Sequence, residues 1–149
     1  MMKLIISSSE LADGGTIPAR YTCDGENISP SISWSEAPPG TQSLVLIVDD
    51  PDAPVGTWVH WVLFNIPSSL RGLPEKVAPV VGVQGQNDFR NLGYGGPCPP
   101  KGKPHRYFFK LYALETNLNL PKAATKANVE KAMQGHILAE GQLIGKYGR

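Results

Sequence analysis

Histidines and aspartates occupy the two segments of this sequence that are best suited to chemistry. The segment "IVDDPDAPVGTWVHW" places Asp49, Asp50 and Asp52 at the end of one apolar run and His60 within the next. Carboxylates are almost never buried without partners, so these positions require a compensating group. The second segment, "GGPCPPKGKPHRYFF", leads from a loop rich in Gly and Pro into a strand that opens at His105.

The spacing of these residues predicts that several of them share a face. Side chains alternate between the two faces of a strand. Trp58 and His60 therefore lie on one face of the earlier strand, and His105 and Tyr107 lie on one face of the later strand, with Arg106 opposite. Each pair joins an imidazole to an aromatic ring beside a proline-rich loop. We expect the two pairs to converge on one pocket.

Binding of a small anion is the chemistry that these groups suit best. Imidazole N–H, tyrosine O–H and backbone N–H groups are donors, and Gly95 and Gly96 let a backbone come close to an oxyanion. A carboxylate would repel the anion, so we expect Asp50 or Asp52 behind a histidine, where it fixes the tautomer and raises the pKa. At least one histidine is then charged in the complex. Asp49 is expected to cap the turn that follows its strand.

Three other chemistries have weaker support. Two histidines and a carboxylate are a known ligand set for iron, but H-E-x-x-H and C-x-x-C spacings are missing, so we expect no metal and no cofactor. A serine nucleophile would call for a G-x-S-x-G elbow, which is also missing. Cys98 and His105 form a conceivable nucleophile pair, although a structural role is the expectation for this thiol.

The composition argues against a nucleic-acid-binding protein and against a membrane-spanning one. A chain of 149 residues fits one domain, covering positions 1–149. Its 14 Lys and Arg nearly balance 13 Asp and Glu, which removes the basic field that would attract nucleic acid. No apolar run approaches the roughly 20 residues of a membrane span. Cys23 and Cys98 could pair, but nothing indicates an oxidising compartment, so both are expected to be reduced and the protein cytoplasmic.

Strand-like runs follow one another with few helical segments between them, which favours an antiparallel sandwich. One amphipathic helix is expected from the N-cap Thr125 to Gly141, with Gly135 inside it. Because X–Pro bonds adopt the cis form readily, we also expect a cis bond in the proline-rich loops, at Pro51, Pro54 or within 97–100. The predicted strands are Lys3–Ile6, Ser31–Trp34, Leu44–Val48, Trp58–Ile66, Val80–Val83, Tyr107–Leu114 and Gln142–Tyr147.

Several separated motifs resemble the phosphatidylethanolamine-binding protein family, whose eukaryotic members are also called Raf kinase inhibitor proteins. These motifs are D-P-D-A-P at 50–54, W-x-H-W at 58–61, and G-P-C-P-P-x-G with H-R-Y at 96–107. The stretches "YTCDGENISPSISW" and "MQGHILAEGQLIGKYGR" extend the likeness over nearly the whole chain, and it is closer to the short bacterial and archaeal branch.

The resemblance implies a mainly β fold, a sandwich of two antiparallel sheets with a C-terminal helix, and a pocket for phosphate, acetate or a phospholipid head group. The expected function is non-enzymatic binding of a small anionic ligand. The alternatives are a regulatory protein that modulates a kinase or protease partner, and a cryptic hydrolase. A homodimer is compatible with either. The pocket residues carried over by motif are Asp50, Asp52, Trp58, His60, Gly96, Pro97, His105 and Tyr107.

Overall fold

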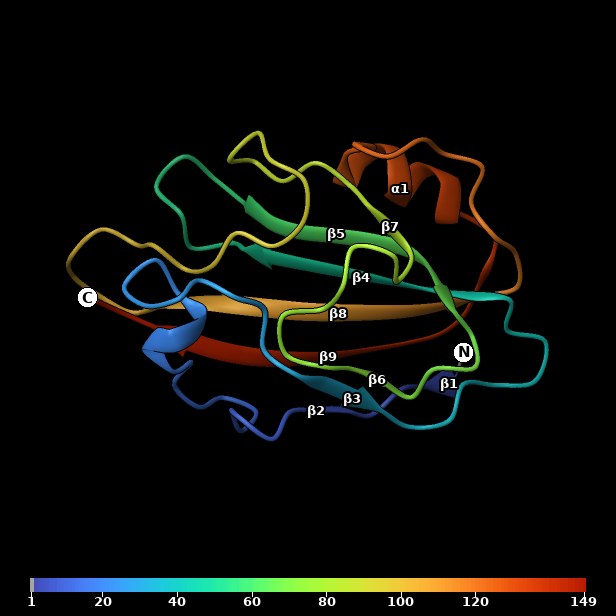
Figure 1. Ribbon diagram of the computed structural model, residues 1–149, viewed down its shortest axis with the longest axis horizontal. Helices are drawn as coiled ribbons and strands as arrows, with labels where there is room; N and C mark the ends of the chain where they lie inside the picture. Colours follow the sequence, from blue (N-terminus) through green and yellow to red (C-terminus); the bar gives the residue numbers. More distant parts are fainter. Residues whose placement is uncertain (1) are drawn as a thin grey trace.

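Two sheets face each other in the computed structural model, which describes residues 2–149 (Figure 1). The larger sheet has six strands in the order β1-β9-β8-β4-β5-β7, and the smaller has three in the order β2-β3-β6. Pairing is antiparallel except between β1 and β9, which are parallel. The mainly β sandwich with a single helix is therefore confirmed. The elements are β1 (Met2–Lys3), β2 (Ile6–Ser7), the 3-10 turn η1 (Ala19–Tyr21), β3 (Ile32–Trp34), β4 (Ser43–Asp50), β5 (Trp58–Pro67), β6 (Gly72–Leu73), β7 (Val83–Gln84), β8 (His105–Leu114), α1 (Lys126–Met133) and β9 (Ile137–Tyr147).

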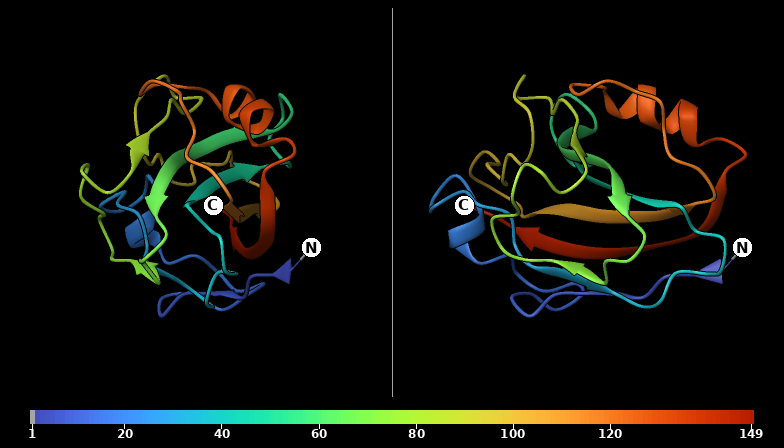
Figure 2. Two further views of the ribbon diagram at one scale, coloured as in Figure 1. Left: turned by 90° about the vertical axis from the view of Figure 1, so that its right-hand side faces the viewer. Right: turned by 45° about the vertical axis from the view of Figure 1, so that its right-hand side comes forward.

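Strand β4 lies at the centre of the molecule, and all of its residues are buried. Its side chains alternate between two apolar layers. Leu44 and Val48 belong to the layer between the sheets, whereas Val45 and Ile47 belong to the layer beneath helix α1. Figure 2 shows the helix and the smaller sheet on different sides of the larger sheet. A strand covered on both faces reads as a continuous apolar run, which explains the unbroken pattern in its sequence.

Helix α1 is shorter than predicted because Gly135 lies beyond its end, with a φ of 81°. The Thr125 hydroxyl accepts a 3.2 Å hydrogen bond from the Asn128 N–H, and the Asn128 side chain accepts one of 3.1 Å from the Thr125 N–H. This pair forms a capping box in which Asn replaces the usual Glu or Gln. A residue in the left-handed region commonly terminates a helix. The prediction of a helix to Gly141 is wrong, because β9 (Ile137–Tyr147) occupies that segment.

A β-bulge in β5 interrupts the alternation of side chains between His60 and Trp61, so that both lie on the side of the smaller sheet. Trp61 pairs with Val48 and Val59 pairs with Asp49, which leaves His60 as the extra residue between two ladder positions. Bulges bend a strand locally and redirect a side chain. His60 packs against a ring of β8 on the side that faces the smaller sheet.

The loops that follow β4 and precede β8 meet at the end of the larger sheet where the C-terminus also lies (Figure 1). Every peptide bond among the described residues is trans, so the predicted cis bond at Pro51, Pro54 or within 97–100 is wrong. No helix in residues 2–149 is long and apolar enough to cross a membrane.

Candidate functional site

A cavity of about 240 Å³ opens where the start of β5 meets the start of β8. Five of the eight residues predicted for the pocket line it: Asp50, Trp58, His60, His105 and Tyr107. The alternation of side chains along the two strands therefore brings both histidine–aromatic pairs to one place. The other lining residues are Ala53, Pro54, Val55, Phe89, Cys98, Pro99 and Pro100.

Asp50 orients His105 from behind. It is the last residue of β4 and only 3% exposed. Its Oδ2 accepts a 2.7 Å hydrogen bond from Nδ1 of His105, and its Oδ1 accepts one of 2.7 Å from the Asp52 N–H. Because an ionised carboxylate only accepts hydrogen bonds, the ring carries a proton on Nδ1. Nε2 is then the ring nitrogen that remains for a ligand.

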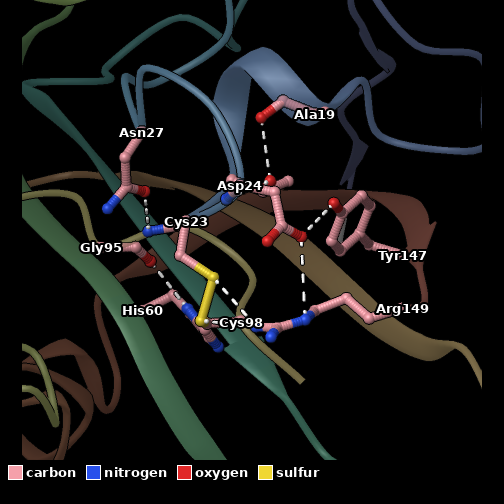
Figure 3. Close-up of a disulfide and its surroundings, with 11 residues drawn as sticks. Ala19, Cys23, Asp24, Asn27, His60, Gly95, Cys98, Tyr147 and Arg149 are labelled. Atoms are coloured by element: carbon pink, nitrogen blue, oxygen red, sulfur yellow. Dashed lines mark hydrogen bonds and ion pairs between the residues drawn. A yellow bond between two sulfur atoms is a disulfide. The ribbon is translucent and has the colours of Figure 1, made fainter. Parts of the chain in front are cut away.

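His60 is fixed by Gly95 on the neighbouring loop (Figure 3). Its Nδ1–H donates to the Gly95 carbonyl at 2.7 Å, and the Gly95 N–H donates to the His60 carbonyl at 2.9 Å. The histidine is 3% exposed, and this burial lowers its pKa below the usual 6.5 despite the carbonyl at Nδ1. The neutral ring offers Nε2 as an acceptor, whereas the sequence predicted a donor at this position.

Aromatic rings form the walls around these histidines. The Phe89 ring meets Trp58 and His60 edge-to-face, at centroid distances of 5.5 and 5.4 Å, and His60 meets Tyr107 at 5.1 Å. Burial raises the pKa of the Tyr107 hydroxyl, which keeps it protonated and able to donate. Trp58 Nε1 is buried and has no hydrogen-bond partner among the described residues.

The sequence reasoning missed Phe89, which lines the cavity from a loop between β7 and β8. Asn87 is buried and holds this loop closed, because its Oδ1 accepts from the N–H groups of Phe89 and Asn91 at 2.9 and 3.1 Å. The local sequence signal for this loop is the Asn87 of "QNDFRN", since asparagine side chains readily accept hydrogen bonds from the backbone two residues on.

Asp52 does not line the cavity. It forms a two-pronged ion pair with Arg106, from Oδ1 to Nη2 at 2.8 Å and from Oδ2 to Nε at 2.9 Å, and also accepts the Arg106 N–H. These hydrogen bonds lower the pKa of Asp52 to about 2. The chain leaves β4 before this residue, so strand alternation no longer governs its direction.

Gly96 and Pro97 also lie outside the cavity lining. The Gly96 N–H donates to the Asn27 side chain at 2.8 Å, and the Pro97 carbonyl accepts the Cys23 N–H at 3.1 Å. A side chain at Gly96 would collide with the carbonyl oxygen of Tyr21. This glycine thus permits close packing of two loops. The predicted cradle of glycine N–H groups is wrong, because the N–H of Gly95 is also used within the protein.

Cys23 and Cys98 form a disulfide at the wall of the cavity, so the prediction of reduced thiols is wrong (Figure 3). Arg149 Nη1 lies 3.4 Å from one sulfur and 3.2 Å from the other. The two cysteines are 75 residues apart in sequence, and their proximity depends on contacts between two loops. The bond also removes Cys98 as a nucleophile for the pair with His105.

Asp49 lies on the opposite face of β4 from Asp50 and does not cap a turn, contrary to the prediction. It is 1% exposed, and its Oδ2 accepts a 3.1 Å hydrogen bond from Nζ of Lys110 and forms an ion pair with Nζ of Lys126 at 2.9 Å. Lys110 belongs to β8 and Lys126 to α1, so one carboxylate ties the helix to the sheet. No group of three or more potential ligands within residues 2–149 is arranged to hold a metal ion.

Comparison with known proteins agrees with this architecture. The pattern of the phosphatidylethanolamine-binding protein family matches residues 7–148. The chain is 57% identical over 142 residues to the UPF0098 protein of Methanothermobacter thermautotrophicus, covering 92% of this chain and 93% of that protein. It is 53% identical over 150 residues to the UPF0098 protein of Aquifex aeolicus, covering 97% of this chain and 88% of that protein.

Two crystal structures have nearly the same fold. A phosphatidylethanolamine-binding protein homologue from Chlamydia trachomatis superposes with a TM-score of 0.93 at 39% identity, covering 100% of this chain and 99% of the other. YbcL of E. coli, a member of the mammalian PEBP family, superposes with a TM-score of 0.91 at 35% identity, covering 99% of each chain. This chain therefore belongs to the phosphatidylethanolamine-binding protein family, together with these bacterial and archaeal relatives.

Proposed function

We propose that this protein binds a small oxyanion, a phosphate, phosphate ester or carboxylate, in the cavity between β5 and β8, and does so without chemical turnover. The indole N–H of Trp58 carries the proposal, because it is the one buried side-chain N or O atom of the described residues that has no partner. An unsatisfied buried donor costs about 1–3 kcal/mol. A bound oxygen acceptor would offset that cost. The Tyr107 hydroxyl supplies a further donor at the same cavity, and Nε2 of His105 supplies another when this ring carries a proton on both nitrogens.

The charges around the cavity favour a ligand of low charge. No Lys or Arg belongs to the lining, and Asp50 stands directly behind His105. A protonated His105 paired with this carboxylate is neutral overall, so the site offers hydrogen bonds more than net charge. An anion nevertheless favours the protonated ring, and binding should take up a proton as it does so.

Binding explains the lining better than hydrolysis does. The thiol that could have served as nucleophile is held in the disulfide, and the other walls are proline, valine and aromatic rings. A mostly apolar cavity with a few convergent polar groups is typical of a ligand site. The disulfide removes the reason for expecting a cytoplasmic protein, because that expectation rested on reduced cysteines. A protein partner remains a separate proposal, for which the same cavity would receive a phosphorylated or carboxylate side chain.

Calorimetric titration with acetate and inorganic phosphate tests the proposal. Wild-type protein should bind both, and Trp58→Phe, which keeps the ring but removes the N–H donor, should weaken binding by roughly tenfold. His136→Gln is the matched control, since His136 is only half-buried and bonds Glu115 outside the set of lining residues. Absence of binding to wild-type protein at millimolar anion, or unchanged affinity in Trp58→Phe, would contradict the proposed role of this cavity.

A further inference from the structure

The two histidines of the cavity have different hydrogen-bonding roles, although the sequence presents them alike. Nδ1 of His105 bonds a carboxylate, whereas Nδ1 of His60 bonds the main-chain carbonyl of Gly95. Asp50 supports a positive charge on His105 directly. A carbonyl oxygen supports the N–H of a neutral ring and brings no full negative charge to His60.

The surroundings of His60 hold it neutral. The side chain is almost fully buried, and Phe89 and Tyr107 pack edge-to-face against it. Burial is the largest influence on its pKa and lowers it, outweighing the backbone of Gly95 and Gly96 and the charges of Asp50 and Asp49, which all raise it. With Nδ1–H committed to Gly95, the lone pair of Nε2 is what this ring contributes to the cavity that it lines.

A lone pair at that position has a chemical consequence for the ligand. An oxygen atom without hydrogen would meet Nε2 lone pair to lone pair, which is repulsive, while an O–H group would donate to it. Trp58 Nε1 can only donate, and the Tyr107 hydroxyl is able to donate, so both suit an acceptor on the same ligand. The cavity thus presents donors together with one acceptor, a combination that a fully deprotonated oxyanion such as acetate satisfies only in part and that should therefore bind it more weakly.

Resting on the proposed function above, we infer that Nε2 of His60 accepts a hydrogen bond from the ligand, so that the cavity selects oxyanions that still carry a hydroxyl. Singly protonated phosphate and phosphomonoester monoanions meet this requirement. Sulfate, sulfate monoesters and phosphodiesters do not, because none of them has an acidic hydrogen left at neutral pH. His60 is then the residue that determines specificity.

Methyl phosphate and methyl sulfate form the matched pair for the test. At pH 5.5 both are mainly monoanions of nearly equal size, and they differ by one hydroxyl, since a phosphate ester has its second ionisation near pH 6. Titration calorimetry should find methyl phosphate bound roughly ten- to hundredfold more tightly. At pH 7.5 inorganic phosphate should bind more tightly than sulfate, because both are then largely dianions and only phosphate keeps a hydrogen. Dimethyl phosphate should bind as poorly as methyl sulfate.

His60→Gln checks that this residue is the cause. A glutamine amide can rotate to present either its oxygen or its N–H, so the discrimination should fall to about threefold or less, whereas the His136→Gln control should keep it. Equal or tighter binding of methyl sulfate to the wild-type protein would overturn the inference, as would undiminished discrimination in His60→Gln.

The tautomer of the ring gives a reading that does not depend on any ligand. Long-range ¹H–¹⁵N spectra of the free protein at pH 7.5 should show His60 protonated at Nδ1 and bare at Nε2. If none of the anions binds, the proposed function fails and the selection that rests on it fails too; if the anions bind without discrimination, the proposed function stands and only the inference fails. A proton on Nε2 of His60 in the free protein at pH 7.5 overturns the inference whatever the anions do.

Discussion

Replacing Asp49 by asparagine should destabilise the protein without changing its cavity. This carboxylate is 1% exposed and forms ion pairs with two ammonium groups, those of Lys110 on β8 and Lys126 on α1, and Lys110 also donates a hydrogen bond to it. The substitution keeps the shape of the side chain but removes its charge. Both lysines lose a charged partner, and the helix loses its ionic contact with the sheet.

The magnitude follows from the exposure of the partners. A hydrogen bond to a charged group contributes about 1.5–3 kcal/mol, and the ion pair with Lys126 contributes no more than that, so the two contacts set an upper limit of roughly 6 kcal/mol. The Lys110 and Lys126 side chains are 28% and 21% exposed, which lets their ammonium groups recover water, and the amide oxygen introduced by the substitution can still accept one bond. We expect a loss of about 2–3 kcal/mol in the free energy of unfolding, or roughly 4–12 °C in melting temperature for a chain of this size.

Urea denaturation at pH 7, followed by circular dichroism, measures this loss. Asp50→Asn is the matched variant, because Asp50 is the next residue on the same strand but contacts His105 on the opposite face. Asp49→Asn should leave methyl phosphate affinity within about twofold, while Asp50→Asn should weaken it by roughly tenfold or more, since a charged His105 loses its partner. A stability loss below about 0.5 kcal/mol for Asp49→Asn would show that the buried carboxylate does not hold the helix.

Three further predictions concern protons and the disulfide. The folded pKa of His60 lies below 6.5, so between the two pKa values the unfolded chain binds a proton that the folded chain does not. The free energy of unfolding should therefore fall as the pH drops from about 6.5 toward the folded pKa. Urea midpoints measured over this range should depend less on pH in His60→Gln than in the wild-type protein. The lowered pKa of Asp52, about 2, contributes stability that is present above its usual 3.8 and disappears toward pH 2; acid titration of Asp52→Asn should lack that step. Cys98→Ser, which opens the link to Cys23, should cost about 2–4 kcal/mol by thermal unfolding in the absence of reductant, and an unchanged midpoint would argue that the bond adds nothing.

The sequence predicted those parts of the site that depend on strand periodicity. Trp58, His60, His105 and Tyr107 meet because a two-residue repeat fixes the face of each side chain once the strands pair. Asp50 lies at the last position to which this repeat applies. Asp52, beyond the end of the strand, points elsewhere and bonds an arginine instead.

What the sequence could not predict depends on contacts between distant segments. The N–H of Gly96 is taken by Asn27, and Cys98 bonds Cys23, both across loops that share no local pattern. The tautomer of His60 depends on a carbonyl 35 positions away. Helix α1 ended early for a local reason, because Gly135 permits a left-handed conformation, and apolar spacing beyond it suited the following strand as well as a helix.

Consecutive aspartates on opposite faces of β4 have a consequence for how the strand finds its partners. Its preceding residues are apolar on both faces, so shifting the strand by one position would exchange one apolar layer for another at little hydrophobic cost. The same shift would turn the Asp49 carboxylate toward the aromatic rings of the cavity. It would also turn Asp50 toward the face of Lys110 and Lys126, but displaced along the strand from the position that Asp49 occupies. Unpaired buried charge costs several kcal/mol per ion. The two carboxylates therefore penalise a shift of β4 by one position, which hydrophobic burial alone would tolerate, and so help to fix the register of the strand.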